Sequence, residues 1–309
     1  MRLRAGRRLR ETATRWAMGL LALAASWLVV WITLALALRA WPILSAQRLD
    51  ELLLSTTWRP SQGLFGYFPF IMGTLWVTLL AMLIAVPVCL LVAIYLAEYA
   101  PPRLYQPIKP LIDLAAGIPS VVYGVWGVLA VVPIVQWLAV SGPGQWWGDF
   151  CLFGASNPTG FSVLAGGVVL AIMVFPVIIS VAEDVIRAVP QGLREASLAL
   201  GATRWQTVKH VVLRRAAPGV IAAIVLGFSR AFGETMAVLM VVGNVPQVPR
   251  SLFDPAYPLT ALIANNYGEM MSIPLYDAAL MGAALILLLV VLAFNIGARL
   301  ILQRLTCWE

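Results

Sequence analysis

The sequence predicts an all-α integral membrane protein with six transmembrane helices. Of its 309 residues, 61% are hydrophobic and only 11% are charged, whereas a soluble domain carries about 25% charged residues. Six apolar segments are each long enough to cross a hydrocarbon core, which takes about 20 helical residues. None of them alternates with a two-residue period, so helices are expected rather than the strands of a barrel.

The six segments follow one another from end to end of the chain. They run approximately over residues 16–40, 69–97, 111–138, 161–182, 216–243 and 278–302. The first follows a basic N-terminus at 1–15 and is joined to the second by a loop that ends near residue 64. We therefore expect a main transmembrane domain over 65–303, with a polar segment at 189–215 and a short tail at 304–309.

The distribution of lysine and arginine predicts the orientation, because cytoplasmic loops of membrane proteins carry an excess of these residues. With the N-terminus in the cytoplasm, sixteen of the 21 basic residues fall on that side: Arg2, Arg4, Arg7, Arg8, Arg10, Arg15, Arg103, Lys109, Arg187, Arg194, Arg204, Lys209, Arg214, Arg215, Arg299 and Arg304. Only Arg39, Arg48, Arg59 and Arg250 fall on the other side. Both termini are therefore expected in the cytoplasm. The net charge of +7 is explained by this bias and gives no reason to expect nucleic acid as a partner.

Residues suited to metal binding or catalysis are scarce. The chain has one histidine and three cysteines, and no cysteine pair has the spacing of a metal site. No G-x-x-x-x-G-K-[ST] phosphate-binding loop occurs. We expect no metal site, no catalytic residue and no cofactor in this chain. If ATP drives its activity, another subunit must bind the ATP and its magnesium ion.

The polar segment at 189–215, "VPQGLREASLALGATRWQTVKHVVLRR", is predicted to form a helix, a turn and a second short helix. Apolar residues recur at helical spacing until Gly201 interrupts them. Basic side chains surround the segment, so one interpretation is a helix that touches anionic lipid headgroups.

The segment also carries a family pattern: "EASLALGA" followed by "VVLRRAAPG" resembles the EAA loop of ABC-importer permeases. The resemblance favours a rigid helical knob that receives motion from a partner protein over a helix that touches lipid. The matching positions include Glu195, Ala196, Ser197 and Gly201. Ser197 replaces an alanine of the family pattern, and Arg214 stands where proline is usual. The resemblance implies that this loop docks into a groove of a separate cytoplasmic ATPase.

The fifth apolar segment contains two charges in the string "GFSRAFGETMAV". A central arginine costs about 2.5–3.5 kcal/mol on insertion scales, so Arg230 is expected to face the bundle interior or a water-filled cavity. Glu234 lies four residues later, on the same face of a continuous helix. The two could form an intrahelical ion pair and nothing more. Since buried pairs seldom add net stability, and the guanidinium suits oxyanions, a substrate path is the preferred interpretation.

Three polar residues near these charges complete the candidate path. Ser229, Thr235 and Asn244 would place hydroxyl and amide donors along the same line. Asp113, by contrast, is interpreted as a residue at the cytoplasmic start of the third segment, with contact to the path as the alternative.

The longer strings "SRAFGETMAVLMVVGNVPQVPRSLFDP" and "LAEYAPPRLYQPIKPLIDLAAGIPSVVYGVWG" resemble the C-type permease subunits of bacterial phosphate-specific ABC importers, over about residues 65–303. The resemblance implies a type I (MetI-like) core of about five helices preceded by one N-terminal helix. It also implies the inner membrane, a sister A-type permease, two copies of the ATPase and a periplasmic phosphate-binding protein. Arg230 and Glu234 would then face a path between the two permeases.

Other functions remain open. A permease for sulfate, molybdate or phosphonate would need the same kind of arginine. A stand-alone channel or secondary carrier would not need the loop at 189–215. A membrane enzyme acting on lipid-linked substrates would want clustered acidic or histidine residues, and the chain offers only Glu183 and Asp184, which are interpreted as charges at the end of the fourth segment.

Overall fold

The computed structural model describes residues 2–306 apart from 141–156, 270–272 and 274, so residues 307–309 of the predicted tail lie outside it. The elements are α1 (Arg2–Ala46), α2 (Leu49–Leu54), β1 (Trp58–Arg59), η1 (Pro60–Gln62), β2 (Leu64–Phe65), α3 (Phe68–Ile94), η2 (Tyr95–Tyr99), α4 (Pro102–Ala115), α5 (Ser120–Trp126), η3 (Gly127–Val131), α6 (Val132–Val140), α7 (Val163–Arg187), α8 (Gln191–Ala199), α9 (Arg204–Thr207), η4 (Val208–Val212), α10 (Leu213–Phe232), α11 (Met236–Val241), α12 (Leu259–Asn266) and α13 (Tyr276–Thr306). The two strands pair in an antiparallel hairpin.

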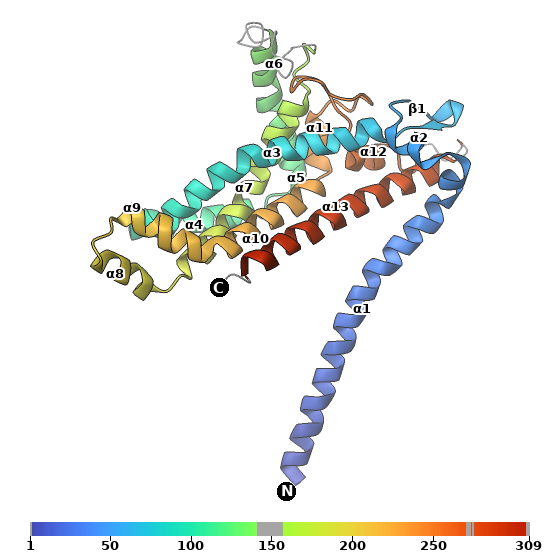
Figure 1. The fold of residues 1–309 in the computed structure, drawn as a ribbon. Helices are drawn as coiled ribbons and strands as arrows, with labels where there is room; N and C mark the ends of the chain where they lie inside the picture. The colour runs from blue at the N-terminus through green and yellow to red at the C-terminus, as the bar shows by residue number, and fades with distance from the viewer. Residues whose placement is uncertain (1, 141–156, 270–272, 274, 307–309) are drawn as a thin grey trace.

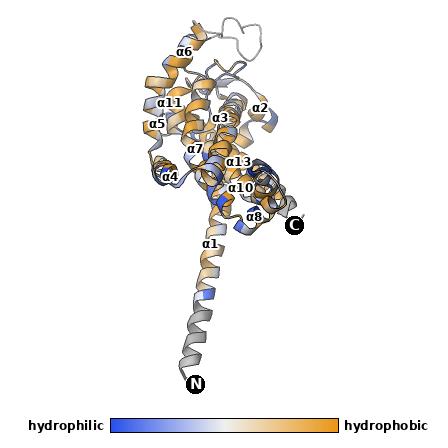
Figure 2. Cartoon of the chain, turned by 90° about the vertical axis from the view of Figure 1, so that its left-hand side faces the viewer, coloured by the Kyte–Doolittle hydropathy of each residue, from blue (hydrophilic) through white to orange (hydrophobic). Residues whose placement is uncertain are grey.

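The prediction of six transmembrane helices is confirmed. Within the described part of the chain, six helices are long and apolar enough to cross a membrane: Thr14–Ala46, Phe68–Tyr99, Ser120–Val140, Val163–Arg187, Arg204–Phe232 and Tyr276–Leu300. Three of these contain a short π-helical stretch, namely η2, η3 and η4. Figure 2 shows that apolar residues dominate the bundle, whereas hydrophilic residues gather near α8.

The bundle is organised around α7, which packs between α3 and α10, while α13 lies against α10 (Figure 1). In its most apolar stretch, 67% of the residues of α7 are buried. Small residues bring the helices close, as is common in membrane bundles. A Cβ atom at Gly227 of α10 would lie 2.6 Å from the Ile178 side chain of α7, and one at Gly167 would lie 2.7 Å from Leu80 of α3.

The first helix stands apart from the bundle. α1 packs against α13 near its own C-terminal end, where Ala40 and Ile43 are completely buried in a cluster with Ala279 and Ala283. From there it extends away from the other helices toward the N-terminus (Figure 1). Its apolar window is 0% buried within this chain, so this surface is available to lipid or to another subunit.

The third and fourth segments differ from their predicted ends. The third was expected to begin at 111, but α4 ends at Ala115 and a new helix begins at Ser120, after Pro119. Proline disfavours helical geometry in the residue before it, which accounts for the interruption. The fourth segment was expected to end at 182, but α7 continues to Arg187. Glu183 therefore lies near the end of this helix as expected, but its side chain is completely buried instead of facing the polar loop.

The fifth segment was predicted as one helix over 216–243, and this is also wrong. The second short helix of the polar loop runs through η4 directly into α10, which ends at Phe232. A separate helix, α11, begins at Met236. Gly233 follows the last residue of α10, and glycine has a low helix propensity.

Candidate functional site

The interruption between α10 and α11 carries the two charges that the sequence singled out. Arg230 lies in the last turn of α10, and Glu234 lies in the connection to α11. Because the helix ends between them, they do not share a helical face. Within the described residues, no ion pair joins the two side chains. The intrahelical ion pair, which was the alternative to a substrate path, is therefore absent among the described residues.

Glu234 is held by contacts with neighbouring helices. Its Oε1 accepts a hydrogen bond from the backbone N–H of Ala237 at 3.2 Å, and its carbonyl accepts one from the hydroxyl of Thr260 at 3.0 Å. It also lines a small gap together with Thr74 and Thr78 of α3. These threonines lie about 9 and 15 Å along α3 from its start at Phe68, so the interruption lies inside the membrane rather than at its surface.

Arg230 has an exposed side chain in the isolated chain. Its positive charge lies within electrostatic range of the Tyr123 hydroxyl on α5. That hydroxyl donates a hydrogen bond to the carbonyl of Ala115 at the end of α4, at 3.0 Å. An arginine exposed at this depth is tolerated only beside water or a covering partner. The arrangement therefore offers a cation that an anion can approach from the α5 side of the subunit.

The three neighbouring polar residues do not form the single line that we expected. The Ser229 hydroxyl donates to Asn295 Oδ1 of α13 at 2.9 Å, so it faces a different helix from Arg230. Thr235 donates to the carbonyl of Gly233 at 3.4 Å. Asn244 has a left-handed backbone with φ of 53° and lines a separate hollow of about 440 Å³. Ser229 points away from Arg230 because consecutive residues of a helix face about 100° apart, whereas Thr235 and Asn244 are redirected because α10 ends before them.

The polar loop has the predicted helix–turn–helix form and lies at the end of the bundle opposite α2 (Figure 1). Gly201 makes the turn with a left-handed φ of 84°. Glu195 and Ala196 are exposed on α8, whereas the Ser197 hydroxyl is hydrogen-bonded to that of Thr207 at 2.9 Å. The second helix begins with a capping box between Thr203 and Gln206. These contacts make the two short helices one rigid unit.

Large apolar side chains on this loop face solvent. Leu200 is 90% exposed and Trp205 is 52% exposed. Exposed apolar residues gathered at the polar end of a membrane bundle indicate a surface for a partner protein. The position fits the coupling role that the resemblance implies for the loop.

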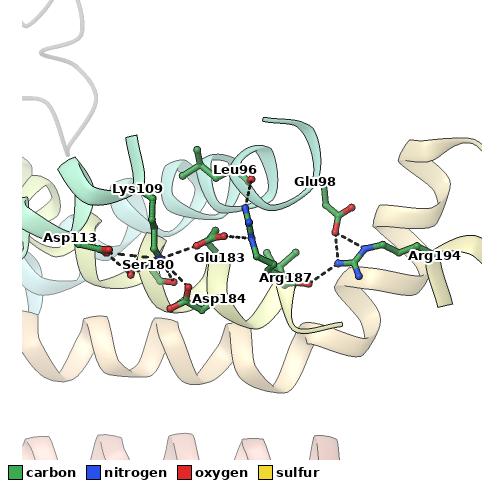
Figure 3. Close-up of polar contacts among 10 residues, drawn as sticks. Leu96, Glu98, Lys109, Asp113, Ser180, Glu183, Asp184, Arg187 and Arg194 are labelled. Carbon is green, nitrogen blue, oxygen red and sulfur yellow. Dashed lines mark hydrogen bonds and ion pairs between the residues drawn. The ribbon is translucent and has the colours of Figure 1, made fainter. Parts of the chain in front are cut away.

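The sequence reasoning missed a polar cluster beside the loop. Glu183 is completely buried and forms ion pairs with Lys109 of α4 and Arg187 of α7 (Figure 3). One signal was present, since Glu183 and Arg187 are four residues apart at the end of an apolar segment. The partner Lys109, 74 positions earlier, could be identified only from the fold.

Comparison with known proteins agrees with this architecture. The sequence model of the family described as "Binding-protein-dependent transport system inner membrane component" matches residues 89–306. The chain belongs to this family. It is thus a multi-pass membrane transport component, a permease of the ABC transporter class.

Several members of the family resemble the chain over most of its length. It is 39% identical over 250 residues to the phosphate transport system permease protein PstC of Pasteurella multocida, covering 80% of this chain and 78% of that protein. The protein of the same name from Xylella fastidiosa strain 9a5c is 40% identical over 255 residues, covering 82% and 78%.

A solved structure supports the fold. The chain is similar to a structure described as inward-facing conformations of the MetNI methionine ABC transporter, with a TM-score of 0.55 and 21% sequence identity. The match covers 75% of this chain and 93% of that chain. The predicted MetI-like permease core is therefore confirmed as the fold of this family member.

Proposed function

We propose that this chain is a transmembrane permease subunit of an ATP-driven phosphate importer. The observation that carries the proposal is the 39–40% identity, over about four-fifths of the chain, to permeases named for phosphate transport. The exposed Arg230 agrees with it, because a planar guanidinium suits an oxyanion. A single arginine would bind phosphate with only moderate affinity, which is useful in a path that must release its substrate.

In this proposal the translocation path runs between this chain and a sister A-type permease. The sister subunit would cover the α5 side of the bundle and enclose Arg230 together with water. Glu234 would lie beside the path, where its carboxylate fixes the start of α11. Thr235 would be a second contact, whereas Ser229 and Asn244 would act by holding neighbouring elements, given their bonds to Asn295 and Leu239.

Coupling to ATP would pass through the loop at 189–215. Two copies of a cytoplasmic ATPase would bind ATP and magnesium, and one of them would dock against Glu195, Ala196, Ser197 and Gly201. A periplasmic phosphate-binding protein would deliver the anion from the other side. In this proposal both termini of the chain lie in the cytoplasm, in keeping with the excess of basic residues on that side.

The test is phosphate uptake in bacterial cells that lack their own phosphate importers. The cells would express the whole operon with this chain deleted or restored, and radiolabelled phosphate would be supplied with an excess of sulfate, molybdate or phosphonate. Restored uptake that ignores these competitors supports the proposal. Uptake that is abolished by a competitor identifies another oxyanion as the substrate, and uptake that persists without the ATPase gene identifies a carrier instead.

A further inference from the structure

The buried charge of Glu183 joins two helices at the end of the bundle that carries the polar loop (Figure 1). Its side chain is completely buried in α7, with Lys109 Nζ of α4 at 2.8 Å and Arg187 Nε at 2.7 Å (Figure 3). Burial lowers the pKa of Lys109, but its hydrogen bonds to Glu183 and Asp184 outweigh this and leave the pKa above its ordinary value. The lysine is therefore charged and fixed at neutral pH.

Further contacts hold α4 against α7 along one face. Lys109 also donates to Ser180 Oγ at 2.9 Å, and Ser180 donates to Asp113 Oδ1 at 2.9 Å. The guanidinium of Arg187 lies over the ring of Tyr105, 3.9 Å from its centre. Tyr105, Lys109 and Asp113 are spaced by four residues, so α4 presents a single polar stripe to α7.

The same end of α7 is bonded to the polar loop. Arg194 of α8 donates to Glu98 Oε1 at 3.0 and 2.7 Å and to the carbonyl of Ile186 at 2.9 Å. Arg187 donates to the carbonyl of Leu96 at 3.2 Å. A continuous set of charge-assisted bonds therefore runs from α8 through η2 and the end of α7 to α4.

This set of bonds continues toward the candidate path. α4 ends at Ala115, whose carbonyl accepts a hydrogen bond from Tyr123 of α5, and the Tyr123 hydroxyl lies within electrostatic range of Arg230. Replacing a buried ion pair with apolar residues is often neutral or stabilising, so packing alone gives no reason for a charge at position 183. The contact between Glu183 and Lys109 instead favours one relative position of α4 and α7, because a shift would separate two buried charges and leave Glu183 with Arg187 of its own helix alone.

We propose that Glu183 is a positioning residue that makes the polar loop move as one body with α4 and with the connection from α4 to α5 at 116–119. The proposal rests on the proposed function, in which α8 receives the motion of an ATPase. A push on α8 reaches α7 through Arg194, and Glu183 passes it to α4 through Lys109. The connection at 116–119 then moves α5 relative to Arg230, which changes the access of the anion to Arg230.

The test uses the whole transporter, with its ATPase and binding protein, in proteoliposomes, and measures phosphate uptake and ATP hydrolysis together. Glu183→Gln should raise the ATP hydrolysed per phosphate by about 2- to 30-fold, while hydrolysis per assembled complex stays within about twofold of wild type. The matched control is Glu51→Gln, which neutralises an exposed carboxylate on α2, at the other end of the bundle. It should leave the ratio unchanged.

A second variant covers the case in which Glu183→Gln does not assemble. Lys109→Met removes the contact from α4 but leaves Glu183 paired with Arg187, so it should assemble and show the same raised ratio. Lys109→Arg should restore the ratio toward that of wild type. If Lys109→Met keeps the wild-type ratio, or loses hydrolysis and uptake in equal measure, Glu183 has only a structural role. Wild-type transporter that fails to move phosphate would instead contradict the proposed function.

Discussion

Substituting Arg230 with lysine and with glutamine separates two roles that the structure allows for this residue. Arg230 lies in the last turn of α10, where a positive charge stabilises the negative end of the helix by about 0.3–1 kcal/mol. Lysine would supply that charge as well as arginine does. If Arg230 instead contacts an oxyanion through its planar fork, lysine keeps the charge but loses the paired hydrogen bonds.

The expected magnitude follows from the contact that is lost. A hydrogen bond to a charged group contributes about 1.5–3 kcal/mol, and each 1.36 kcal/mol changes a rate by about tenfold. Arg230→Gln should therefore lower phosphate uptake about 10- to 150-fold, and Arg230→Lys should fall between glutamine and wild type. Both variants should assemble normally, because the side chain is exposed and no described residue forms an ion pair with it.

The assay is uptake of radiolabelled phosphate per assembled complex, over a range of phosphate concentrations. The matched control is Arg250→Gln, which removes the same charge from an exposed arginine outside the six spans. Full activity of Arg230→Lys together with loss in Arg230→Gln would mean that a charge at the helix end suffices. Full activity of both variants would refute the assignment of Arg230 to the path.

Three further predictions concern coupling and packing. Glu195→Lys should raise the ATP hydrolysed per phosphate without loss of assembly, because Glu195 is exposed on α8. The control is Glu51→Lys, an exposed glutamate at the other end of the bundle, and equal effects of the two variants would contradict a docking role for Glu195. Gly227→Ala should destabilise the protein by about 1–3 kcal/mol in thermal unfolding, because its Cβ would lie 2.6 Å from Ile178, whereas Gly297→Ala, with open space around it, should not. Tyr67→Phe should cost about 1 kcal/mol by losing the 2.7 Å hydrogen bond to the Ala279 carbonyl, and exposed Tyr267→Phe should cost nothing measurable by the same assay.

The number and order of the transmembrane helices could be predicted because lipid imposes one simple requirement, a long apolar run with its backbone bonds satisfied internally. The ends of the helices could not, because a proline, a glycine or a π-helical turn changes the local geometry without changing hydropathy. Pro119 separates α4 from α5, and Gly233 ends α10, yet both positions lie inside runs that are apolar enough to span.

The candidate site could be predicted only in part, because the sequence shows single unusual residues but not their partners in space. Arg230 and Glu195 could be singled out because a charge in an apolar run and a loop motif are visible in the sequence. The partners of Ser229 and Glu183 could not be, since Asn295 and Lys109 are 66 and 74 positions away and are brought close only by helix packing. A helical wheel drawn through position 233 also gives the wrong neighbours for every residue beyond it.

The break after α10 and the two charges beside it are explained better together than separately. Ending a helix inside the membrane leaves peptide groups that need partners, and such breaks are tolerated where they are buried in protein or line a water-filled cavity. Arg230 lies at the C-terminal end of α10, and Glu234 accepts the Ala237 N–H at the start of α11, so each charge suits the helix end nearest to it. A continuous apolar helix would need neither charge nor break. The sequence instead keeps all three features, with Glu234 beside Thr74 and Thr78 and with the Arg230 side chain exposed, as the proposed path requires.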